Sequence, residues 1–212
     1  MKKKSTTDMV MAGIFIALIC LLGLTPGLGY IPLGVIRITT VHIPVIIGAI
    51  LLGPGYGALL GGMFGLTSFI NNTFSPVITS FVFTPFYTLG EAKGNLWSLV
   101  ICFVPRILIG VVAYYVYIGL KKLVKSKNSR YIALMGAGIA GSLTNTILVM
   151  NLIYFCFGKQ YALYAKPTEI AYDTLYTVII GVIAGNGIPE AIGAAILVTA
   201  IGGTLLKLKN IQ

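Results

Sequence analysis

Apolar runs alternate with short polar, charged or glycine-rich segments along the whole 212-residue chain. A helix needs about 20 mainly apolar residues to cross the hydrocarbon core of a bilayer. The pattern therefore predicts six membrane-spanning helices, at about residues 9–24, 40–52, 57–70, 96–120, 131–157 and 188–206. The second run is short, so its helix is expected to begin earlier, in the preceding loop.

The connections between these runs differ strongly in length. Gly53-Pro54-Gly55-Tyr56-Gly57 is a turn signal that leaves almost no room for a loop, so the second and third spans are expected to form an antiparallel hairpin. Residues 71–95 and 158–177 are long, polar and aromatic connections. A last apolar run, 178–184, is expected to end at Gly185-Asn186-Gly187, before the sixth span. Long connections in a compact protein are usually functional.

Charge gives the orientation. Ten of the fifteen basic residues fall on one side of the six predicted spans, and four of the five acidic residues fall on or near the other. Lys and Arg in short loops mark the cytoplasmic face. We therefore predict an all-α integral membrane protein, a six-transmembrane-helix bundle with both termini cytoplasmic, forming a single domain over residues 1–212. The basic residues on that side are Lys2, Lys3, Lys4, Lys121, Lys122, Lys125, Lys127, Arg130, Lys207 and Lys209; the acidic residues on the other are Glu91, Glu169, Asp173 and Glu190.

Composition supports this class. The chain is 57% hydrophobic and 9% charged, with a mean hydropathy of +0.95, which is too apolar for a soluble domain of this length. Its net charge of +10 lies at the ends of spans, where it sets orientation and meets anionic lipid headgroups, so no nucleic-acid partner is expected. The first helix has no clear cleavage site and is not expected to be a signal peptide. The three isolated cysteines are expected to be buried apolar residues.

Several polar residues lie within or beside the predicted spans. Arg106 stands about ten residues into the fourth span, after Pro105. A charge at this depth costs about 2.5–3.5 kcal/mol, so it normally faces a cavity or a partner. It either ties the bundle together, through a helix carbonyl or Glu190, or binds a substrate carboxylate or carbonyl. Asn186 and Glu190 have the pattern of a helix start, and they also share a helix face that can line a pocket.

Other candidates are the two amides of the fifth span and the single histidine. Asn145 and Asn151 need a neighbouring helix or a ligand as partner in an apolar setting. His42, at the outer start of the second span, is either a packing residue or a ligand contact. Aromatic residues gather toward the outer side, where an interfacial belt accounts for several and a ligand wall for others.

Small residues form helix faces suited to close packing in lipid. Gly57, Gly61 and Gly65 recur every fourth residue in the third span, and Ala12, Gly13 and Ala17 lie in the first. Such faces let helix backbones approach each other. They pack within one bundle or, in the first span, dock another membrane subunit.

The sequence lacks the motifs of the main enzymatic alternatives. It has no GxxxxGK[ST], no HExxH and no paired-cysteine site, so neither a cofactor nor a metal is expected and the protein is not expected to be an enzyme. A membrane enzyme would need convergent acid, base or metal groups. A carrier driven by an ion gradient and a purely structural subunit remain as alternatives. If the protein transports, its energy comes from gradients or from another subunit.

Four segments resemble one family, the substrate-binding S components of energy-coupling-factor (ECF) vitamin transporters. They are LGVIRITTVHIPVIIGAILLGPGYGALLGGMFGLTSF (33–69), CFVPRILIG (102–110), SLTNT (142–146) and NGIPEAIGAAILVTAI (186–201). The similarity covers nearly the whole chain in the same order. It implies a six-helix bundle in the bacterial cell membrane, with one vitamin bound near the outer face and the loop between spans one and two as a lid.

The resemblance also implies partners: a transmembrane coupling subunit and two ATPase subunits. The family often docks through an AxxxA motif in the first span. Here Ile16 stands four residues after Ala12, and the nearest pair is Gly13 with Ala17. The docking face is therefore expected to be shifted by one residue.

Within the family the chain looks most like the pantothenate-type subunits. Arg106 and Arg37 are expected to neutralise the ligand carboxylate, while Asn145, Asn151, Asn186 and Glu190 bond its amide and hydroxyls, with His42 as a further contact. An S component for riboflavin, a pyridoxine-like vitamin, folate or a thiamin precursor is the alternative.

Overall fold

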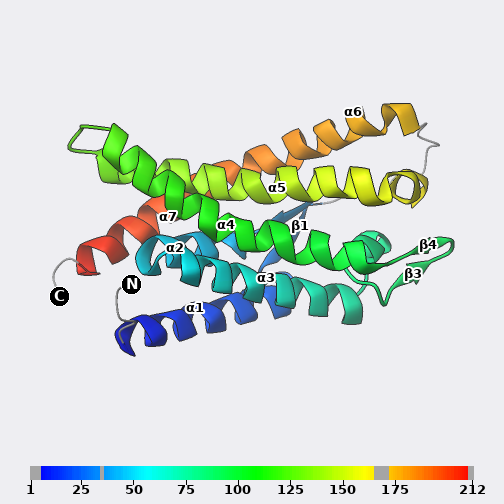
Figure 1. Ribbon diagram of the computed structural model, residues 1–212, viewed down its shortest axis with the longest axis horizontal. Coiled ribbons are helices and arrows are strands. Elements are labelled where there is room, and N and C mark those ends of the chain that lie inside the picture. The colour runs from blue at the N-terminus through cyan, green and yellow to red at the C-terminus, as the bar shows by residue number, and fades with distance from the viewer. Residues whose placement is uncertain (1–5, 34–35, 165–171, 210–212) are drawn as a thin grey trace.

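The computed structural model describes residues 6–33, 36–164 and 172–209; within them, the side chains of residues 31–33, 36–38, 163–164, 172–174 and 209 lie outside the description. Long helices dominate this part of the chain and lie roughly along one axis (Figure 1). They are α1 (Thr6–Leu24), α2 (His42–Leu52), α3 (Pro54–Phe74), α4 (Leu96–Leu123), α5 (Ser129–Tyr164), α6 (Tyr172–Val182) and α7 (Ile188–Lys209).

Four helical segments are long and apolar enough to cross a membrane: Thr6–Leu24, Leu96–Leu123, Ser129–Ala162 and Leu175–Leu208. The mostly helical membrane class predicted from the sequence is therefore confirmed. α2 is a shorter apolar helix of 11 residues, and α3 has 21 residues with many glycines and polar side chains toward its end.

The α2–α3 junction is a one-residue turn. Gly53 stands between the two helices with φ of 99°, in the region that favours glycine, and Pro54 begins α3 where its missing N–H has no helical partner to lose. Asn95 begins α4 in a capping box: its side chain accepts from the N–H of Trp97, and Ser98 Oγ accepts from the N–H of Asn95.

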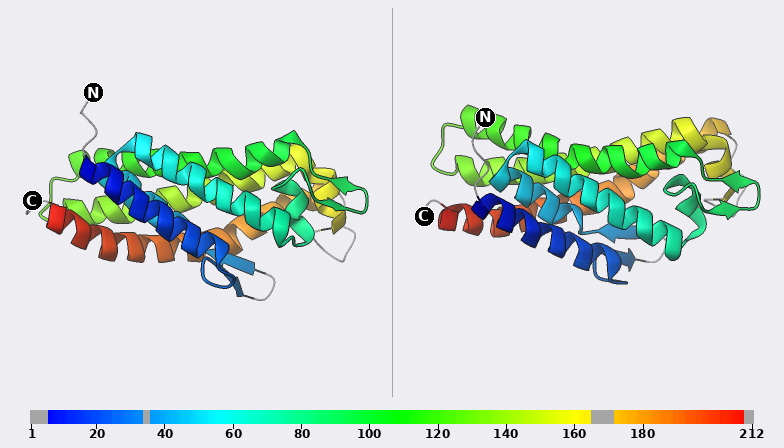
Figure 2. Two further views of the ribbon diagram at one scale, coloured as in Figure 1. Left: turned by 90° about the horizontal axis from the view of Figure 1, so that it is seen from below. Right: turned by 60° about the horizontal axis from the view of Figure 1, so that its bottom comes forward.

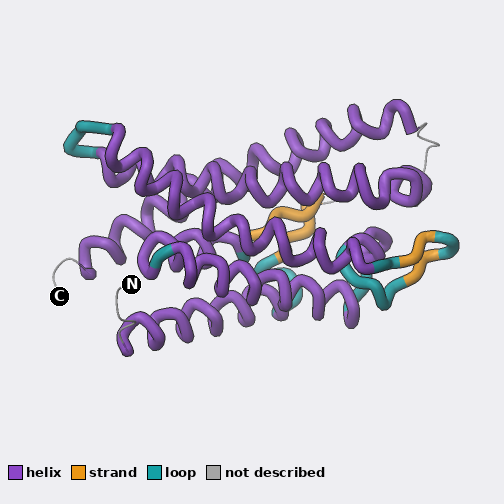
Figure 3. Tube along the Cα trace, viewed as in Figure 1, coloured by secondary structure: helices purple, strands orange, loops and turns teal. Residues whose placement is uncertain are grey.

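Short strands and 3-10 turns complete the connections (Figure 3). β1 (Tyr30–Leu33) pairs antiparallel with β2 (Ile36–Thr39), with Tyr30 opposite Thr39, between α1 and α2. η1 (Ile78–Val82) and a small hairpin of β3 (Thr88–Leu89) and β4 (Ala92–Lys93) join α3 to α4. The helical bundle predicted from the sequence thus also contains two hairpins.

The turn expected at Gly185–Gly187 is different in the structure. Residues Ile183–Gly187 form η2, a single π-helical turn, and both flanking residues, Val182 and Ile188, have helical φ and ψ. α6, η2 and α7 are therefore one interrupted helix, and Asn186 lies inside the π turn rather than capping a new helix. A π turn inserts an extra residue into a helix and often marks a functional site.

The first turn of α1 and the last turn of α7 lie at the same end of the bundle as the α4–α5 connection (Figures 1 and 2). The β3–β4 hairpin lies at the opposite end, where α5 ends and α6 begins. The predicted basic residues Lys2 to Lys4 and the acidic Glu169 lie outside the described residues.

The helices of the centre pack through glycines. α3, α4, α5 and α7 make the most extensive helix contacts. A Cβ added at Gly61 would lie 2.7 Å from the Cα of Ile107, and one added at Gly110 would lie 2.7 Å from the Cα of Gly57. Backbones this close exclude any side chain, so the small-residue face of α3 serves packing within this chain against α4.

Buried apolar side chains form two separate clusters. The first joins α1, α2, α3, α4, α5 and α7 and includes Ile46, Ile109 and Ala137. The second joins η1, α4, α5 and α6 and includes Phe81 and Ile101 among its buried members. Along α4 the clusters are separated between residues 101 and 109, and along α5 between residues 137 and 149.

Candidate functional site

Polar side chains fill the interval between the two apolar clusters. We call this group the polar layer; all its members are buried, with exposed fractions from 1% (His42) to 8% (Asn145). Two of these side chains carry a formal charge in their ionised forms, and the others are hydroxyl, amide or imidazole groups. The members are His42, Arg106, Ser142, Asn145, Thr146 and Glu190.

Arg106 is placed by the proline before it. Pro105 has no N–H, so the carbonyl of Ile101, one turn earlier in α4, lacks its usual helical donor. A terminal nitrogen of Arg106, Nη1, donates to that carbonyl. The guanidinium also lies over two aromatic rings, with Cζ 5.0 Å from the ring centroid of Phe83 and 5.8 Å from that of Phe64. One of the two roles predicted for Arg106, a hydrogen bond to a helix carbonyl, is therefore present, and Nη1 makes it.

Arg106 also has a donor atom that is not used within the described structure. The Nε of Arg106 is buried and has no hydrogen-bond partner among the described residues. Guanidinium groups carry five N–H donors in a fixed fork. An unsatisfied buried donor costs about 1–3 kcal/mol, and more for a charged group, so this atom is a candidate for a ligand contact.

Three further members of the polar layer also have unpartnered atoms within the described chain. They are both ring nitrogens of His42, Oγ of Ser142 and Oδ1 of Asn145. Native interiors contain few such groups. Several in one layer indicate a place where a polar molecule supplies the missing partners.

Packing brings α2, α4 and α5 together beside these atoms. A Cβ added at Gly141 of α5 would lie 2.7 Å from Cδ1 of Ile46 and 3.3 Å from Cβ of Ala113. α2 and α5 run in opposite directions (Figure 1), so one turn from this contact in each helix leads to His42 and Asn145 at the same level. Ser142 and Asn145 share a face of α5, because residues three apart in a helix are neighbours.

Glu190 closes the layer on the side of α7. Its Oε2 accepts from Oγ1 of Thr146 at 3.3 Å, and its Oε1 accepts from the backbone N–H of Thr39 at 2.7 Å. Gly187 of η2 packs on the same threonine: a Cβ there would lie 3.3 Å from Cγ2 of Thr146. Asn186, half-buried in η2, is its sequence neighbour.

Two predicted residues stand apart. Asn151 donates from Nδ2 to the carbonyl of Ile147 in its own helix. Asn151 lies six positions after Asn145. At about 100° per residue, its side chain is rotated by about 240° around the helix axis and points to another face of α5. Arg37 belongs to β2, and its side chain lies outside the described part of the structure.

The predicted docking residues of α1 fall on two faces. Ala12 is buried inside the bundle, whereas Gly13 and Ala17 are exposed, and a Cβ added at Gly13 would meet nothing within 4 Å. Only 17% of the α1 span is buried. The outer face of this helix is therefore open for contact with lipid or another chain.

Sequence reasoning did not single out Thr39, Ser142 or Thr146, and it placed Phe83 only among the outer aromatic residues. Thr39 acts through its backbone, so its side-chain type carries no signal. Ser142 stands three residues before Asn145 and four before Thr146, so it is a helix neighbour of each, and that spacing was the available signal. Phe83 reaches Arg106 from the connection between α3 and α4, a contact that only tertiary packing creates.

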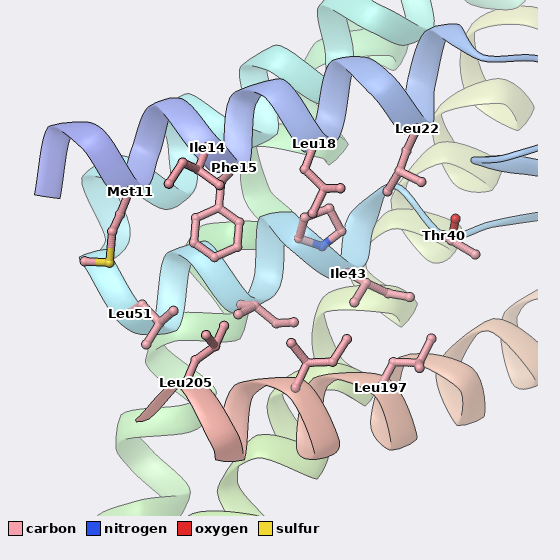
Figure 4. A pocket seen from close by; sticks show the side chains of 13 residues that line it. Met11, Ile14, Phe15, Leu18, Leu22, Thr40, Ile43, Leu51, Leu197 and Leu205 are labelled. Atoms are coloured by element: carbon pink, nitrogen blue, oxygen red, sulfur yellow. The ribbon is translucent and has the colours of Figure 1, made fainter. Parts of the chain in front are cut away.

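Two apolar grooves lie elsewhere among the described residues. One of about 490 Å³ lies between α1, α2 and α7, where Met11, Phe15, Leu22, Ile43 and Leu205 are among the lining residues and Thr40 stands at one end (Figure 4). Another of about 660 Å³ lies between α5 and α7. Neither is lined by a member of the polar layer. A polar vitamin needs hydrogen-bond partners, so the polar layer and not these grooves is the candidate site.

Comparison with known proteins places the chain in a family. Residues 7–202 match the family described as ECF transporter, substrate-specific component. The chain belongs to this family: it is an integral membrane protein and a substrate-specific component of ECF-type transport, as the resemblance predicted. The family works with a transmembrane coupling subunit and ATPases, and its members are transporters rather than enzymes.

Individual relatives cover nearly the whole chain. It is 37% identical over 216 residues to the pantothenic acid transporter PanT of Lactococcus lactis subsp. cremoris, covering 99% of each protein. It is 31% identical over 217 residues to the pantothenate transporter PanT of Leuconostoc mesenteroides subsp. mesenteroides, covering 98% of this chain and 96% of the relative. Among solved structures, the S-component for biotin from an ECF-type ABC transporter aligns over 94% of both chains, with a TM-score of 0.46 and 17% identity.

Proposed function

We propose that this chain is the pantothenate-binding component of an ATP-driven ECF importer. The observation that carries the proposal is the buried Arg106, whose Nε has no partner among the described residues. Atoms of His42, Ser142 and Asn145 are likewise without a partner there. The two relatives, named as pantothenate transporters over nearly their full length, supply the substrate.

The chemistry of pantothenate suits this layer. Its carboxylate matches a guanidinium, which binds carboxylates with charge-assisted hydrogen bonds. Its amide and hydroxyls match the amide oxygen of Asn145, the hydroxyl of Ser142 and the imidazole of His42. Asn186, beside Gly187 in η2, is proposed as a further contact, and the rings of Phe64 and Phe83 exclude water around the charge.

Arg37 stays in the proposal as a second candidate for the carboxylate, since β2 ends beside Glu190 through Thr39. Asn151 is left outside the proposed site because its amide is used within its own helix. Glu190 is also left out as a direct contact: a carboxylate there repels a substrate carboxylate unless a cation stands between them.

For the membrane arrangement we propose a single domain of six spans with both termini cytoplasmic. The interrupted helix of α6, η2 and α7 supplies one span, α1, α4 and α5 supply three, and the α2–α3 hairpin supplies two. Support comes from the basic residues of the α4–α5 connection, Lys121 to Arg130, which lie at the same end as the first turn of α1 and the last of α7.

For the partners we propose a transmembrane coupling subunit and two ATPase subunits, with Gly13 and Ala17 on the docking face. Both residues are exposed and small, so a partner helix can approach the backbone of α1 closely there.

The deciding experiment is mass spectrometry of small molecules released from the detergent-purified protein, followed by calorimetry with pantothenate. Stoichiometric pantothenate supports the proposal; another vitamin overturns the substrate and keeps the family. Uptake into vesicles that hold only this protein, without ATPase partners, would overturn ATP-driven transport in favour of a gradient-driven carrier.

A further inference from the structure

Phe83, whose ring covers the guanidinium of Arg106, belongs to no helix or strand. It follows η1 in the connection between α3 and α4, with φ of −118° and ψ of −13°. A residue in such a connection keeps its place only where the backbone around it is held. Its neighbours Val82 and Thr84 are both fully buried, so the contacts of this short stretch decide where the ring lies.

Ser80 binds this stretch to α3 from the side before Phe83. Its Oγ donates to Oδ1 of Asn72 at 2.8 Å and accepts from the N–H of Val77 at 2.8 Å. Nδ2 of Asn72 donates in turn to the carbonyl of Ser68, one turn earlier in α3, at 2.8 Å. Both ends of the amide are therefore used, which fixes the direction in which Asn72 presents its oxygen to Ser80.

Two further hydroxyl groups hold the same stretch, one on either side of Phe83. Oγ1 of Thr84 lies 2.8 Å from Oγ1 of Thr73 in α3. Thr73 already donates to the carbonyl of Phe69, so the hydroxyl of Thr84 is the donor in this pair. Oγ of Ser98 in α4 donates to the carbonyl of Phe81 at 2.8 Å. We call the three fully buried hydroxyl residues the hydroxyl frame: Ser80, Thr84 and Ser98.

We propose that the hydroxyl frame positions Phe83 over Arg106 and thereby sets the preference of the site for a substrate with a carboxylate, an inference that rests on the proposed function. While the ring covers the guanidinium, it keeps water from the charge, and attraction to a carboxylate is strong in such surroundings. If the ring moves aside, water reaches the guanidinium and weakens that attraction. Hydrogen bonds to the uncharged part of the substrate do not depend on the ring. The frame residues act through the ring and are positioning residues.

The first test compares pantothenate with pantothenol, which has an alcohol in place of the carboxylate. Ser80→Ala is expected to weaken pantothenate binding by about three- to tenfold and to change pantothenol binding by less than about twofold, because the ring is released from the guanidinium. Calorimetry measures both affinities. An equal loss for the two ligands would show that Ser80 only stabilises the fold, and an unchanged pantothenate affinity would show that the ring needs no frame. Either result overturns the proposal.

A matched control lies five residues earlier in the same connection. Ser75 is exposed, so Ser75→Ala makes the same chemical change without removing a contact of the frame. Both affinities are expected to stay within about twofold of the wild type. If Ser75→Ala lost pantothenate binding as selectively as Ser80→Ala, the buried bond to Asn72 would not be the cause, and the proposal would fail.

A double-mutant cycle tests whether Ser80 acts through the ring. Phe83→Leu removes the ring face, so adding Ser80→Ala to this variant is expected to change pantothenate binding by less than about twofold. A loss as large as in the wild-type background would contradict the proposal, because Ser80 would then affect the site by a route that does not include Phe83.

Thr84→Val is a second variant in case Ser80→Ala folds poorly. Valine keeps the shape of threonine and removes the hydroxyl bond to Thr73. A selective loss of pantothenate binding is expected again, by about two- to fivefold. Unchanged selectivity in a folded Thr84→Val protein would count against the frame.

A measurement without substrate follows the ring itself. Replacing Phe83 with para-fluorophenylalanine gives one fluorine NMR signal, which is expected to shift in Ser80→Ala and to stay in place in Ser75→Ala. The two failures are distinct. A protein that shows this shift but binds no pantothenate loses the proposed function and keeps the positioned ring, whereas one that binds pantothenate with an unmoved signal loses the role of the hydroxyl frame.

Discussion

The guanidinium of Arg106 lies over the ring of Phe83, with 5.0 Å between Cζ and the ring centroid. A cation over an aromatic face gains about 0.5–2 kcal/mol, most when water is excluded. The ring thus stabilises the charge without using its N–H donors. This leaves the Nε of Arg106 for a polar partner while the charge itself remains buried.

Replacing Arg106 is expected to remove the carboxylate site. Arg106→Ala should weaken pantothenate binding by more than about tenfold, because a charge-assisted pair in a buried setting is lost. Calorimetry measures the affinity of the variant for pantothenate. Pantothenol, which has an alcohol in place of the carboxylate, is the control ligand: it should bind the wild type weakly, and the variant should no longer distinguish the two. A folded variant with wild-type affinity would remove Arg106 from the site.

Phe83→Leu is expected to weaken pantothenate binding by a few fold, up to about thirtyfold, because leucine keeps an apolar contact but has no ring face for the guanidinium. Phe74→Leu is the matched control, since Phe74 is 80% exposed. Titration of both variants under the same detergent conditions checks the prediction. Equal effects at the two positions would contradict a role for the ring.

Gly61 and Gly62 are neighbours with opposite surroundings. A Cβ at Gly61 would lie 2.7 Å from the Cα of Ile107, while a Cβ at Gly62 would meet nothing within 4 Å. Gly61→Ala should destabilise the protein by about 1–3 kcal/mol and displace Arg106, whose carbonyl it would meet. Gly62→Ala should stabilise it by up to about 1 kcal/mol through helix propensity. Thermal unfolding in detergent compares them; matching shifts would contradict the close α3–α4 packing.

Gly13→Leu is expected to separate transport from binding. The added side chain points away from the bundle, so pantothenate affinity should stay within about twofold, while uptake by the reconstituted complex should fall by about tenfold as helix docking is blocked. Gly181→Leu is the control, because Gly181 is exposed on α6 and also has open space around it. Undiminished uptake with Gly13→Leu would place the docking face elsewhere.

The hydrophobic pattern predicts most of the helices, because bilayer thickness acts on any sequence in the same way. The orientation drawn from the charge pattern stays a prediction. Helices cover five of the six predicted ranges, and α3 and α5 continue past them to Phe74 and Tyr164. The second helix was expected to begin before residue 40, but α2 begins at His42 because the preceding residues Ile36–Thr39 pair as β2 with β1. The sequence predicts that the helical run ends at Gly185–Gly187, whereas the structure has a π turn at Ile183–Gly187 within a continuous helix. Glycine and asparagine there signal a helix end, but the chain stays helical on both sides of the turn, and Gly187 packs close to Thr146 of α5.

The candidate site was predictable only in part. Arg106 is conspicuous as a lone charge in an apolar span, and His42, Asn145 and Glu190 as rare polar groups. The contacts that give them a role are non-local: Phe83 over Arg106 and the N–H of Thr39 on Glu190 depend on how distant segments meet. The N–H of Thr39 is a backbone group that almost every residue type has, so the sequence cannot single it out.

The division of the apolar core into two clusters affects how the molecule responds to its cargo. Asn145 stands between the clusters along α5, and it and His42 each have a buried polar atom with no partner among the described residues. A substrate that forms hydrogen bonds with these groups would connect the two apolar clusters. If the proposed site is correct, the loaded protein is expected to be more rigid than the empty one, and a partner subunit that contacts both halves would respond to that difference.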